Sequence, residues 1–490
     1  MDEERNNALI ALIRRQVREH EKFVTSVETA KRYYLNQNDI VNSTRVEQLA
    51  ERIEQELAKS KNPLRNANNR IPHNWHQLLV DQKTAYIFTY APQFDLGNTT
   101  ASKQLEDLLG DDFTRSCKDL CIDASNAGKA WLHYWVDSTK NSPTFGQFLY
   151  APVPPEQVIP IFSSSLKRTL LAVIRVYRDI DEEGQEWLRY EYWDAKEVRF
   201  FQRPANDAHG DITADPRIVL EASAVSGAVT ADNAVQHKFG VVPFIEFANN
   251  RERTSDLPKY KELIDIYDKV VSGFGNDLED IQEVIFVIKN FGGERLAEIL
   301  QNLKLFKAVK VAEDDSGRQG GLDTLTIDIP VEARRVALDI LRRQIFVSGQ
   351  GVDPDPQSFG SASGVALKFL YSLLEMKVGL METEFRSGFA DLIRAILSYH
   401  GMGLPAKIVQ TFNRSEINNE LENAQVTQML AGILSEYTLL QNNYWVDSVD
   451  NEMERLEKER EAQALPDVYH MTGKLPPPEE VEDDGEEEQG

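Results

Sequence analysis

A chain of 490 residues is too long for a single hydrophobic core, so its length predicts several domains. Hydrophobic residues make up 41% of it and charged residues 27%, which is typical of a folded globular protein and excludes fibrous or wholly disordered classes. The formal net charge of −25 argues against tight DNA binding, which requires a basic surface, although it leaves open a protein that DNA passes without adhering.

Membrane and secretory features are also missing from the sequence. No segment approaches the ~18 consecutive apolar residues that a membrane-spanning helix requires. The N-terminus opens with acidic residues and carries no signal-peptide core, so we expect production in a cytoplasm. The only cysteines, Cys117 and Cys121, lie four residues apart and form no disulfide framework.

The N-terminal quarter of the chain is predicted to be helical. The first 60 residues carry apolar residues at helical spacing, and a loop rich in asparagine follows at 62–69. Residues 73–92 and 101–127 are two further helical blocks, the first ending before Pro92 and the second at Gly128.

Strand patterns begin at Lys129. Residues 129–137, 168–179 and 186–193 are rich in aromatic and β-branched residues, and residues 241–250 form one more strand. Prolines keep residues 152–160 extended, and the small polar residues of 204–236 predict a surface excursion. The fold class is therefore α+β, mostly helical with a β-rich part.

Two helices and a small strand-rich segment come next. Residues 257–288 are predicted to form a helix with Leu263, Ile266, Tyr267, Val270 and Phe274 on its apolar face, and residues 331–349 form a second helix. Between them, residues 285–328 mix short strands, glycines and a turn. This order predicts a stalk with a tip.

The strongest helical pattern runs over residues 363–398. Its apolar stripe repeats with a period close to 3.6 through Leu367, Leu370, Leu374, Val378, Met381, Phe385, Phe389, Leu392 and Ile396. Two more charged helices are predicted at 415–435 and 446–463. The tail that follows is proline-rich and acidic, with eight acids and no base in 479–488, and we expect it to be disordered.

The segment QGVDPDPQSFGSASG at 350–364 raises the question of a phosphate-binding loop. Its glycines lack the P-loop spacing, no lysine follows them, and Asp353 and Asp355 would repel phosphate. The acidic residues also lack the distant glutamate of a calcium-binding EF-hand loop. A mobile acidic loop is the better interpretation.

No other motif predicts catalysis or a metal. His73 and His76, like Cys117 and Cys121, supply two ligands each, whereas a closed zinc site requires four, so buried structural roles are favoured. There is no G-x-S-x-G nucleophile motif and no Cys–His arrangement. We therefore predict no enzymatic activity, no cofactor and no metal.

Two further clusters have a structural and a functional interpretation. The aromatic residues Trp131, Tyr134, Trp135, Tyr190, Tyr192 and Trp193 are suited to base stacking, but sparse basic residues and strand alternation favour a sheet core. Two arginine pairs, Arg334–Arg335 and Arg342–Arg343, lie eight residues apart on one predicted helix. They are suited to contacting phosphates or acidic neighbours, with solvated arginines as the equal alternative.

Several segments resemble the portal proteins of tailed bacteriophages of the siphovirus type. They are VDQKTAYIFTYAP (80–92), the strands of 174–201, the strand and helix of 241–281, and the loop-to-helix junction SFGSASGVALKFLYSLLEMKV (358–378). The resemblance extends from about Glu19 to Leu456. It implies a ring at one capsid vertex, through which double-stranded DNA is packaged and ejected.

The resemblance also implies a domain assignment. Residues 1–256 would form the wing, 257–288 the first stem helix, 289–328 the clip, 329–349 the second stem helix and 350–362 the tunnel loop. Residues 363–412 would form the long wing helix and a following strand, 413–463 the crown and 464–490 the acidic tail. Glycine, serine and proline would let the tunnel loop move, and its aspartates would limit its grip on DNA.

The site residues implied by this assignment fall into three groups. The tunnel loop would present Gln350, Asp353, Asp355, Gln357, Ser358 and Ser361 to DNA. The stem would present Arg334, Arg335, Arg342 and Arg343. The clip would present Lys304, Lys307, Lys310 and Arg318.

The resemblance further implies partners. These are other copies of the chain, twelve in the virion with thirteen as an alternative for isolated protein, and non-specifically bound double-stranded DNA. Terminase, a head-completion or adaptor protein, and the major capsid and scaffolding proteins complete the set. The protein would reside in the virion after assembly in the bacterial cytoplasm. A different ring of the phage neck and, less favoured, a nucleic-acid-processing enzyme stay as alternatives.

Overall fold

The computed structural model describes residues 2–41, 67–137, 142–207, 210–215, 229–231, 233–281, 285–289, 321–325, 330–354, 364–414, 420–441, 443, 446 and 449–464. The chain divides into two compact units, Met1–Glu416 and Ile417–Gly490. Helices and strands both occur, which confirms the α+β class.

The first unit opens with four helices. They are α1 (Asp2–Tyr34), α3 (Trp75–Phe88), α4 (Thr99–Leu109) and α5 (Phe113–Ala127). The prediction of one helical block over 101–127 was wrong, because Gly110 has a φ of +71° and separates α4 from α5. Helix α5 ends as predicted at Gly128, whose φ of +82° provides the left-handed cap.

A small antiparallel sheet has the strand order β11-β2-β3. Its strands are β2 (Lys129–Val136), β3 (Phe148–Val153) and β11 (Phe244–Ala248). Side chains alternate across a strand, so Leu132 and Tyr134 of β2 face the helices while Trp131 faces the opposite way. The predicted strands at 129–137 and 241–250 are thereby confirmed.

A larger antiparallel sheet has the order β4-β5-β6-β7-β10-β9, with β8 paired to β7. Its strands are β4 (Val158–Phe162), β5 (Leu170–Ile180), β6 (Glu186–Trp193), β7 (Glu197–Pro204), β8 (Thr213–Ala214), β9 (Val229–Ala231) and β10 (Ala234–Gln236). Two expectations need correction. Residues 155–157 form a 3₁₀ turn, η1, inside the segment predicted as extended, and short strands occur within 204–236.

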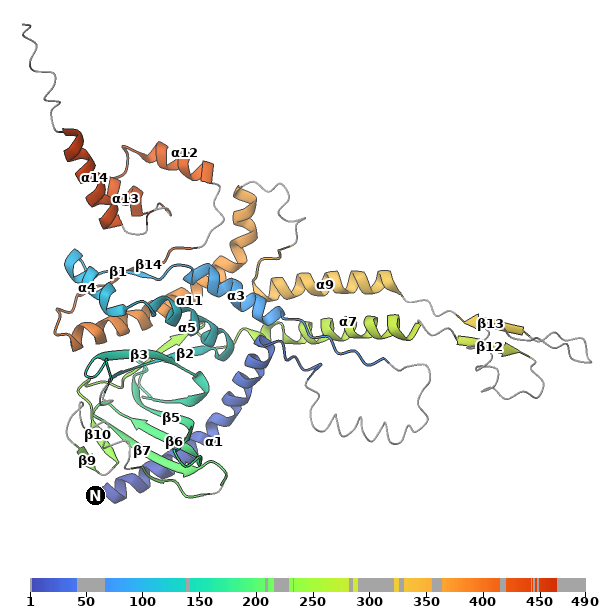
Figure 1. Cartoon of the computed structure of the whole chain (residues 1–490), viewed down its shortest axis with the longest axis horizontal. Helices are drawn as coiled ribbons and strands as arrows, with labels where there is room; N and C mark the ends of the chain where they lie inside the picture. Colours follow the sequence, from blue (N-terminus) through green and yellow to red (C-terminus); the bar gives the residue numbers. More distant parts are fainter. Residues whose placement is uncertain are drawn as a thin grey trace, which may run out of the picture. The chain divides into compact units, whose positions relative to one another are not determined.

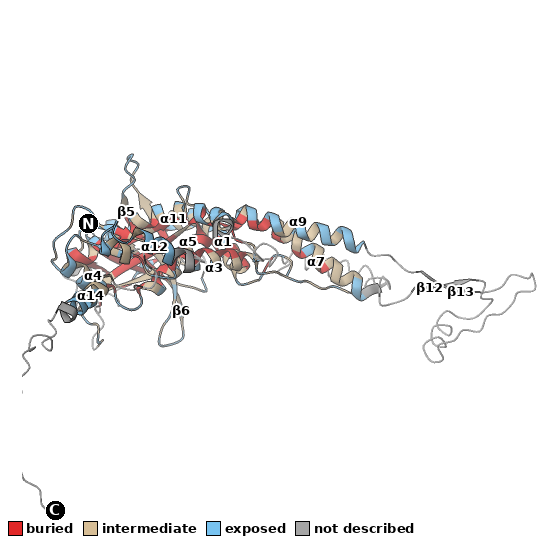
Figure 2. Cartoon of the chain, turned by 90° about the horizontal axis from the view of Figure 1, so that it is seen from above, coloured by how far each residue is buried: buried red, intermediate tan, exposed pale blue. Residues whose placement is uncertain are grey.

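The first unit is layered (Figure 1). Helices α3, α4, α5 and α11 (Gly364–Tyr399) pack on one face of the small sheet. The other face of the small sheet packs on the larger sheet through Trp131, Phe244 and Trp193. Helix α1 covers the outer face of the larger sheet, where Leu9 and Ile13 contact strand residues. Figure 2 shows the buried residues concentrated in these layers.

Helix α11 confirms the long amphipathic helix predicted over 363–398. The described members of the predicted stripe are all buried: Leu374, Val378, Met381, Phe385, Phe389, Leu392 and Ile396. Strand β14 (Val409–Thr411) follows and pairs with β1 (Gln93–Asp95), a pairing that the sequence did not reveal.

Helices α7 (Lys261–Ile281) and α9 (Val331–Gly349) lie side by side, as Figures 1 and 2 show. The 3₁₀ turn η2 (Leu257–Lys259) precedes α7. Helix α9 confirms the prediction for 331–349. The predicted helix 257–288 was too long, because Ile285–Lys289 forms strand β12 and pairs with β13 (Gly321–Leu325). An IFVIK segment is apolar and β-branched, which suits a paired strand.

The second unit contains α12 (Glu420–Leu430), α13 (Glu436–Gln441) and α14 (Val449–Ala464). The predicted helices at 415–435 and 446–463 correspond to α12 and α14, and α13 was not predicted. Across the described parts of both units, every helix is too short or too polar to span a bilayer.

Candidate functional site: the root of the α7–α9 helix pair

The α7–α9 pair is rooted in a small core of its own. Ile264 of α7 and Ile345 and Phe346 of α9 pack against Leu79 of α3 and Tyr33 of α1. These residues come from four helices that are distant in sequence. The core therefore fixes the end of the helix pair to the layered part of the unit.

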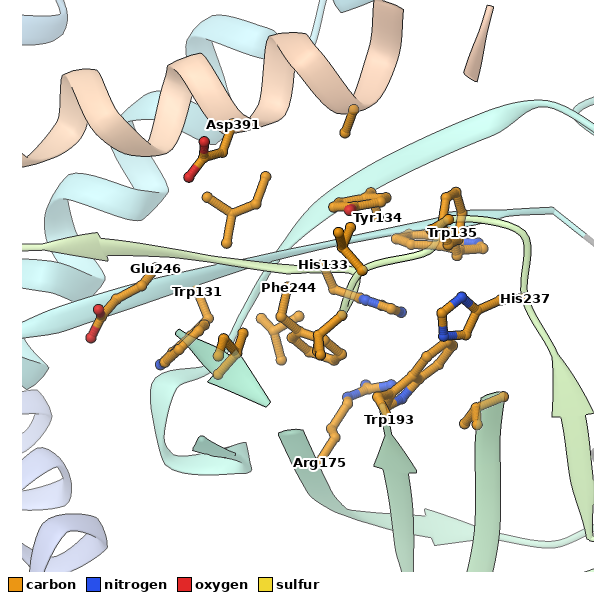
Figure 3. A pocket seen from close by; sticks show the side chains of 18 of the residues that line it. Trp131, His133, Tyr134, Trp135, Arg175, Trp193, His237, Phe244, Glu246 and Asp391 are labelled. Carbon is orange, nitrogen blue, oxygen red and sulfur yellow. The ribbon is translucent and has the colours of Figure 1, made fainter. Parts of the chain in front are cut away.

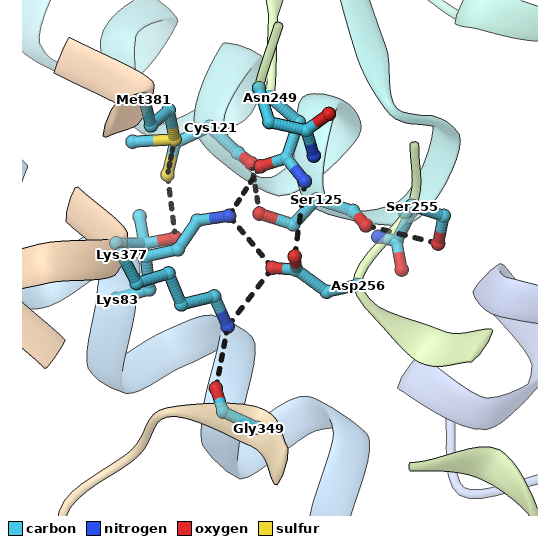
Figure 4. Close-up of polar contacts among 12 residues, drawn as sticks. Lys83, Cys121, Ser125, Asn249, Ser255, Asp256, Gly349, Lys377 and Met381 are labelled. Atoms are coloured by element: carbon cyan, nitrogen blue, oxygen red, sulfur yellow. Dashed lines mark hydrogen bonds and ion pairs between the residues drawn. The ribbon is translucent and has the colours of Figure 1, made fainter. Parts of the chain in front are cut away.

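A buried charge cluster, made of Lys83, Asp256 and Lys377, lies at the same root (Figure 4). The ammonium groups of Lys83 and Lys377 lie 2.8 and 3.1 Å from Asp256 Oδ2. Lys83 Nζ also donates to Asn249 Oδ1 at 2.6 Å. Lys377 Nζ donates to the carbonyl oxygen of Gly349, the last residue of α9, at 2.9 Å.

The cluster joins four segments, since Lys83 lies on α3, Asp256 precedes α7, Gly349 ends α9 and Lys377 lies on α11. Burial raises the pKa of a carboxyl, but the three surrounding lysines outweigh it and hold the pKa of Asp256 well below its usual range. Burial lowers the pKa of Lys377 to about 8, with Asp256 opposing the shift. The carboxylate form of Asp256 is thus the charge that stabilises the cluster.

The segment after α9 begins in a fixed conformation. Gln350 has a left-handed φ of +53° and its N–H closes the helix by donating to Phe346 and Val347. The side-chain amide of Gln82 then makes two hydrogen bonds to the backbone of Val352. It accepts from the Val352 N–H at 3.1 Å and donates to the Val352 carbonyl oxygen at 2.7 Å. At Gly351 a Cβ would lie 2.3 Å from a methyl of Leu79, so any larger residue would require the buried Leu79 side chain to shift.

Two predicted loop residues are described, Gln350 and Asp353. Asp353 accepts a hydrogen bond from Arg342 of α9 at 2.6 Å. The remaining predicted loop residues, Asp355, Gln357, Ser358 and Ser361, lie outside the described residues, as do the clip residues Lys304, Lys307, Lys310 and Arg318. The start of the loop is therefore linked to α9 by an ion pair that the sequence did not predict.

The four predicted stem arginines divide into two pairs. Arg334 is half-buried and bonds to Asp277 of α7, and Arg342 is half-buried and bonds to Asp353. Arg335 is exposed and bonds within its own helix, to Glu332 at 2.6 Å and to Asp339 at 3.4 Å. Arg343 is exposed and makes no ion pair with a described residue. Arg334 and Arg342 thus connect elements, whereas Arg335 and Arg343 face outward.

The buried face of α7 differs from the predicted one. Asp268 and Ser272 are buried on it together with Ile264, while Ile266 is 48% exposed. Asp268 bonds to Asn38 at 2.6 Å and to His73 at 2.8 Å. The sequence pattern missed this face because a polar residue with satisfied hydrogen bonds occupies a core position without adding to the apolar period.

The residue pairs considered as metal ligands have structural roles in the described region. Buried His76 lies between the Tyr260 hydroxyl at 2.7 Å and Asn126 Oδ1 at 2.9 Å, and burial lowers its pKa to about 4. Cys117 and Cys121 are buried free thiols. Among the described residues no group of three or more His, Cys, Asp or Glu side chains is arranged to hold a metal.

The root residues Gln82, Lys83, Asp256 and Lys377 were not predicted as site residues. Lys83 was within reach of sequence reasoning, because it lies on the inner face of α3 between apolar residues such as Val80 and Ile87. Its partners could not be found that way, since Asp256 and Lys377 are far along the chain and only the fold brings them together.

The sequence of the chain is similar to a known protein family and to known proteins. The family described as phage portal protein, SPP1 Gp6-like, matches residues 14–464. The portal protein of Clostridium phage phiCD119 is 42% identical over 455 residues, covering 90% of this chain and 94% of that protein. The portal protein of Bacillus phage SPP1 is 30% identical over 473 residues, covering 93% and 87%.

A solved structure, the neck of a native GTA particle computed with C12 symmetry, is also similar. It covers 78% of this chain and 91% of that chain, with 12% identity and a TM-score of 0.37. This similarity is too weak to carry an argument. The sequence matches establish the family, because they cover nearly the whole of this chain and nearly the whole of each relative. The chain belongs to the phage portal protein family, in its SPP1 Gp6-like group.

Proposed function

We propose that copies of this chain form a ring at one vertex of a phage capsid, and that double-stranded DNA enters and leaves through the channel of that ring. Membership of the portal family supports this function. In the proposal DNA contacts the channel through its backbone without sequence specificity, so that it slides rather than binds.

One observation on this chain supports the proposed ring. The α7–α9 pair exposes apolar side chains to solvent in the isolated chain, a pattern that favours burial against other copies. They are Ile266, Leu278, Val331, Val336, Ile340 and Val347, exposed by 43 to 55%. A ring would bury these side chains between neighbouring subunits. The helix pair of one isolated chain cannot bury them.

Each segment has a place in this proposal. Residues 1–256 are the wing, 257–288 and 329–349 the stem, and 289–328 the clip. Residues 350–362 are the tunnel loop, 363–412 the long wing helix with its strand, 413–463 the crown and 464–490 the tail. The cluster of Lys83, Asp256 and Lys377 then joins wing, stem and the start of the tunnel loop.

The proposed partners follow from the same role. Terminase docks at the clip during packaging, and a head-completion or adaptor protein replaces it afterwards. The major capsid and scaffolding proteins contact the ring during assembly in the host cytoplasm, and the virion contains twelve copies. The chain itself turns over no ATP and cuts no DNA, because the motor protein supplies the energy.

The test combines mass, image and function. Native mass spectrometry and electron microscopy of the purified protein should give a closed ring with an axial channel. Phage particles made without this chain should contain no packaged DNA, and complementation with the gene in trans should restore it. Only monomers and dimers at every salt concentration, or ATP turnover lost on mutating this chain, would contradict the proposal.

A further inference from the structure

The aromatic rings between the two sheets of the first unit form a core and present no surface to a partner (Figure 3). Phe244, His133 and Trp193 are all buried there. The His133 ring stacks on Phe244 and on Trp135, with centroids 4.2 and 5.5 Å away, and Trp193 meets its edge at 4.8 Å. A partner chain therefore has to bind on an outer surface, and the α7–α9 pair carries exposed apolar residues.

The side of α9 that faces away from α7 carries a regular stripe, which we call the α9 seam. Its members are exposed and follow one another after 3, 4, 3 and 4 residues: Ala333, Val336, Ile340, Arg343 and Val347. Ile345, which is buried in the root core, lies on the opposite side of the helix. This spacing is that of the a and d positions of a coiled coil, at which one helix contacts another. The α9 seam therefore has the pattern of a helix–helix contact.

Two sides of α7 are occupied within the chain. One side packs on α9 and includes Ile264 of the root core. The other faces the segment before α3. There Ser272 Oγ accepts from the N–H of Ile71 at 3.0 Å, and Asp268 Oδ1 lies 2.8 Å from Nδ1 of His73. A single side of α7 is left for contact with another chain.

This remaining side of α7 carries a second stripe, the α7 seam. Its members follow one another after 4, 3 and 4 residues: Glu262, Ile266, Lys269 and Gly273. The first three are exposed, and a Cβ added at Gly273 would meet no atom within 4 Å. Neither Glu262 nor Lys269 makes an ion pair with a described residue. The α7 seam thus combines an apolar residue with charges that the described part of the chain leaves unpaired.

The directions of the helices decide how the two seams can meet. Within one chain α7 and α9 are antiparallel, because Arg334 near the start of α9 bonds to Asp277 near the end of α7. Rotation about a ring axis preserves the direction of each helix along that axis. The α9 helix of one copy therefore also runs opposite to the α7 helix of the next copy.

In this antiparallel order one register matches the seams residue by residue. It brings together opposite charges, apolar residues and small residues: Glu262 with Arg343, Ile266 with Ile340 and Gly273 with Ala333. A shift of one helical turn would set Glu262 against Val347 in one direction and against Ile340 in the other. Either shift would place a carboxylate on an apolar side chain without a partner, which is unfavourable.

We propose that the α9 seam of one copy packs on the α7 seam of the next copy of this chain, with Arg343 paired to Glu262 of that copy. This inference rests on the proposed ring, and it adds which faces meet and in which register. The contact joins two different faces, so its repetition about an axis closes a ring rather than a two-fold dimer. A charged residue within an apolar seam lowers the stability of the contact but fixes its register and its partner.

Charge reversal tests this contact on the full-length protein. Arg343→Glu sets two carboxylates at every contact, and Glu262→Arg sets two guanidinium groups there. Native mass spectrometry at about 0.1 M salt should find the fraction of protein in rings lowered about tenfold in each variant, because like charges across an interface oppose association. Both residues are exposed in the isolated chain, so circular dichroism should report an unchanged fold. Arg335→Glu is the matched control, at an exposed arginine of α9 outside the seam, and it should form rings as the native protein does.

Mixing the two variants separates a contact between copies from any effect within one chain. In an alternating ring, the glutamate introduced at position 343 of one variant meets the arginine introduced at position 262 of the other, and every second contact retains the native pair. We expect the mixture to recover rings with equal numbers of the two variants, which their masses distinguish.

Normal ring yield from either variant alone, or a mixture that recovers no rings, would overturn the proposed pairing. Rings of the native protein in the same experiment would show that the proposed ring itself stands. A native protein that forms no ring would overturn both the pairing and the ring.

Discussion

At the scale of single residues, Asp256 faces three ammonium groups, two of which are buried. Lys83 and Lys377 approach one of its oxygens and Lys259 approaches the other. Removing one partner of a buried ion pair leaves the remaining charge without compensation, which costs more than the pair itself contributes. The cluster should therefore be far more sensitive to loss of its carboxylate than an exposed ion pair would be.

Asp256→Asn is accordingly expected to lower the free energy of unfolding by about 3–5 kcal/mol. Chemical denaturation at fixed protein concentration measures this loss. The matched control is Asp211→Asn, because Asp211 is 88% exposed and bonds to Arg14 at 2.8 Å. The control should change stability by less than about 1 kcal/mol. Equal effects of the two substitutions would show that the buried cluster is not a stabilising centre.

The stability of the protein should depend on pH through Asp123, which lies on α5. Burial is the main cause that raises its pKa from 3.8 to about 7, with Lys31 opposing the shift and Glu156 reinforcing it. The folded state thus binds more protons than the unfolded state between these two pH values, so the contribution of Asp123 to stability falls as pH rises through 7.

Asp123→Asn removes the ionisation and should leave the shape unchanged. We expect the variant to melt at a higher temperature than the native protein at pH 8, where native Asp123 is ionised at a cost. At pH 4 the difference in melting temperature should be much smaller, because Asp123 is protonated in the folded state and begins to be protonated in the unfolded state as well, where its pKa is near the ordinary 3.8. A difference in melting temperature that is the same at both pH values would contradict the raised pKa.

At the scale of elements, helix α11 offers an internal comparison between two glycines. A Cβ at Gly388 would lie 2.6 Å from the buried Phe247 ring of β11, whereas a Cβ at Gly379 would meet no atom within 4 Å. Both residues are in the helix interior, where alanine is intrinsically favoured over glycine. The two positions therefore separate helix propensity from packing.

Gly388→Ala should lower the free energy of unfolding by about 1–3 kcal/mol, because the Phe247 ring has to move in a close-packed core. Gly379→Ala should raise it by about 0.5–1 kcal/mol through propensity alone. Denaturation of the two variants beside the native protein measures both effects. If both alanines stabilise the helix, the close packing of α11 on β11 is looser than described.

The elements also show what sequence patterns predict. The buried stripe of α11 follows directly from period and composition, because it buries one uninterrupted apolar face. Helix α9 and strand β6 were predicted too, although Val336 and Ile340 of α9 are exposed and Arg189 of β6 is buried. The break between α4 and α5 and the strand Ile285–Lys289 were missed. The first depends on the backbone at Gly110, and the second on pairing with residues far along the chain.

The candidate site was less predictable than the fold. The sequence indicated the arginines of α9 and the loop after it, but not that Arg342 bonds to Asp353 or that Gln82 holds Val352. Such contacts join residues on separate elements, and only the packing of α3, α9 and α11 brings them within hydrogen-bond distance. Composition and spacing carry no record of that packing.

At the scale of the whole molecule, the exposed apolar side chains of α9 predict how copies associate. Ile340 is 55% exposed in the isolated chain, so Ile340→Asp should leave the fold of one copy stable. In the proposed ring it would bury a charge between subunits, and native mass spectrometry should show the ring replaced by monomers and small oligomers. Ile180→Asp, at a position on β5 that is 64% exposed, is the control and should still assemble. Rings of normal size from Ile340→Asp would place the subunit contact elsewhere.

The charge of the segment after α9 gives the last prediction. Replacing Asp353 and Asp355 with lysine changes each copy by four charge units. If these residues face DNA, lysine–phosphate contacts should hold the duplex in the channel and reduce the fraction of filled capsids, while rings still form. The loss should weaken as salt rises, because screening shortens the range of those contacts.

Lysine at 353 also breaks the ion pair between Asp353 and Arg342 and places two cations together. Asp355→Lys alone retains the pair and should show about half of the defect. The control reverses two exposed carboxylates elsewhere, Asp211 and Glu252, which gives the same net charge. An equal drop in the fraction of filled capsids in the control would assign the defect to net charge. A defect confined to the loop variants, with intact rings, would place residues 353–355 against the DNA.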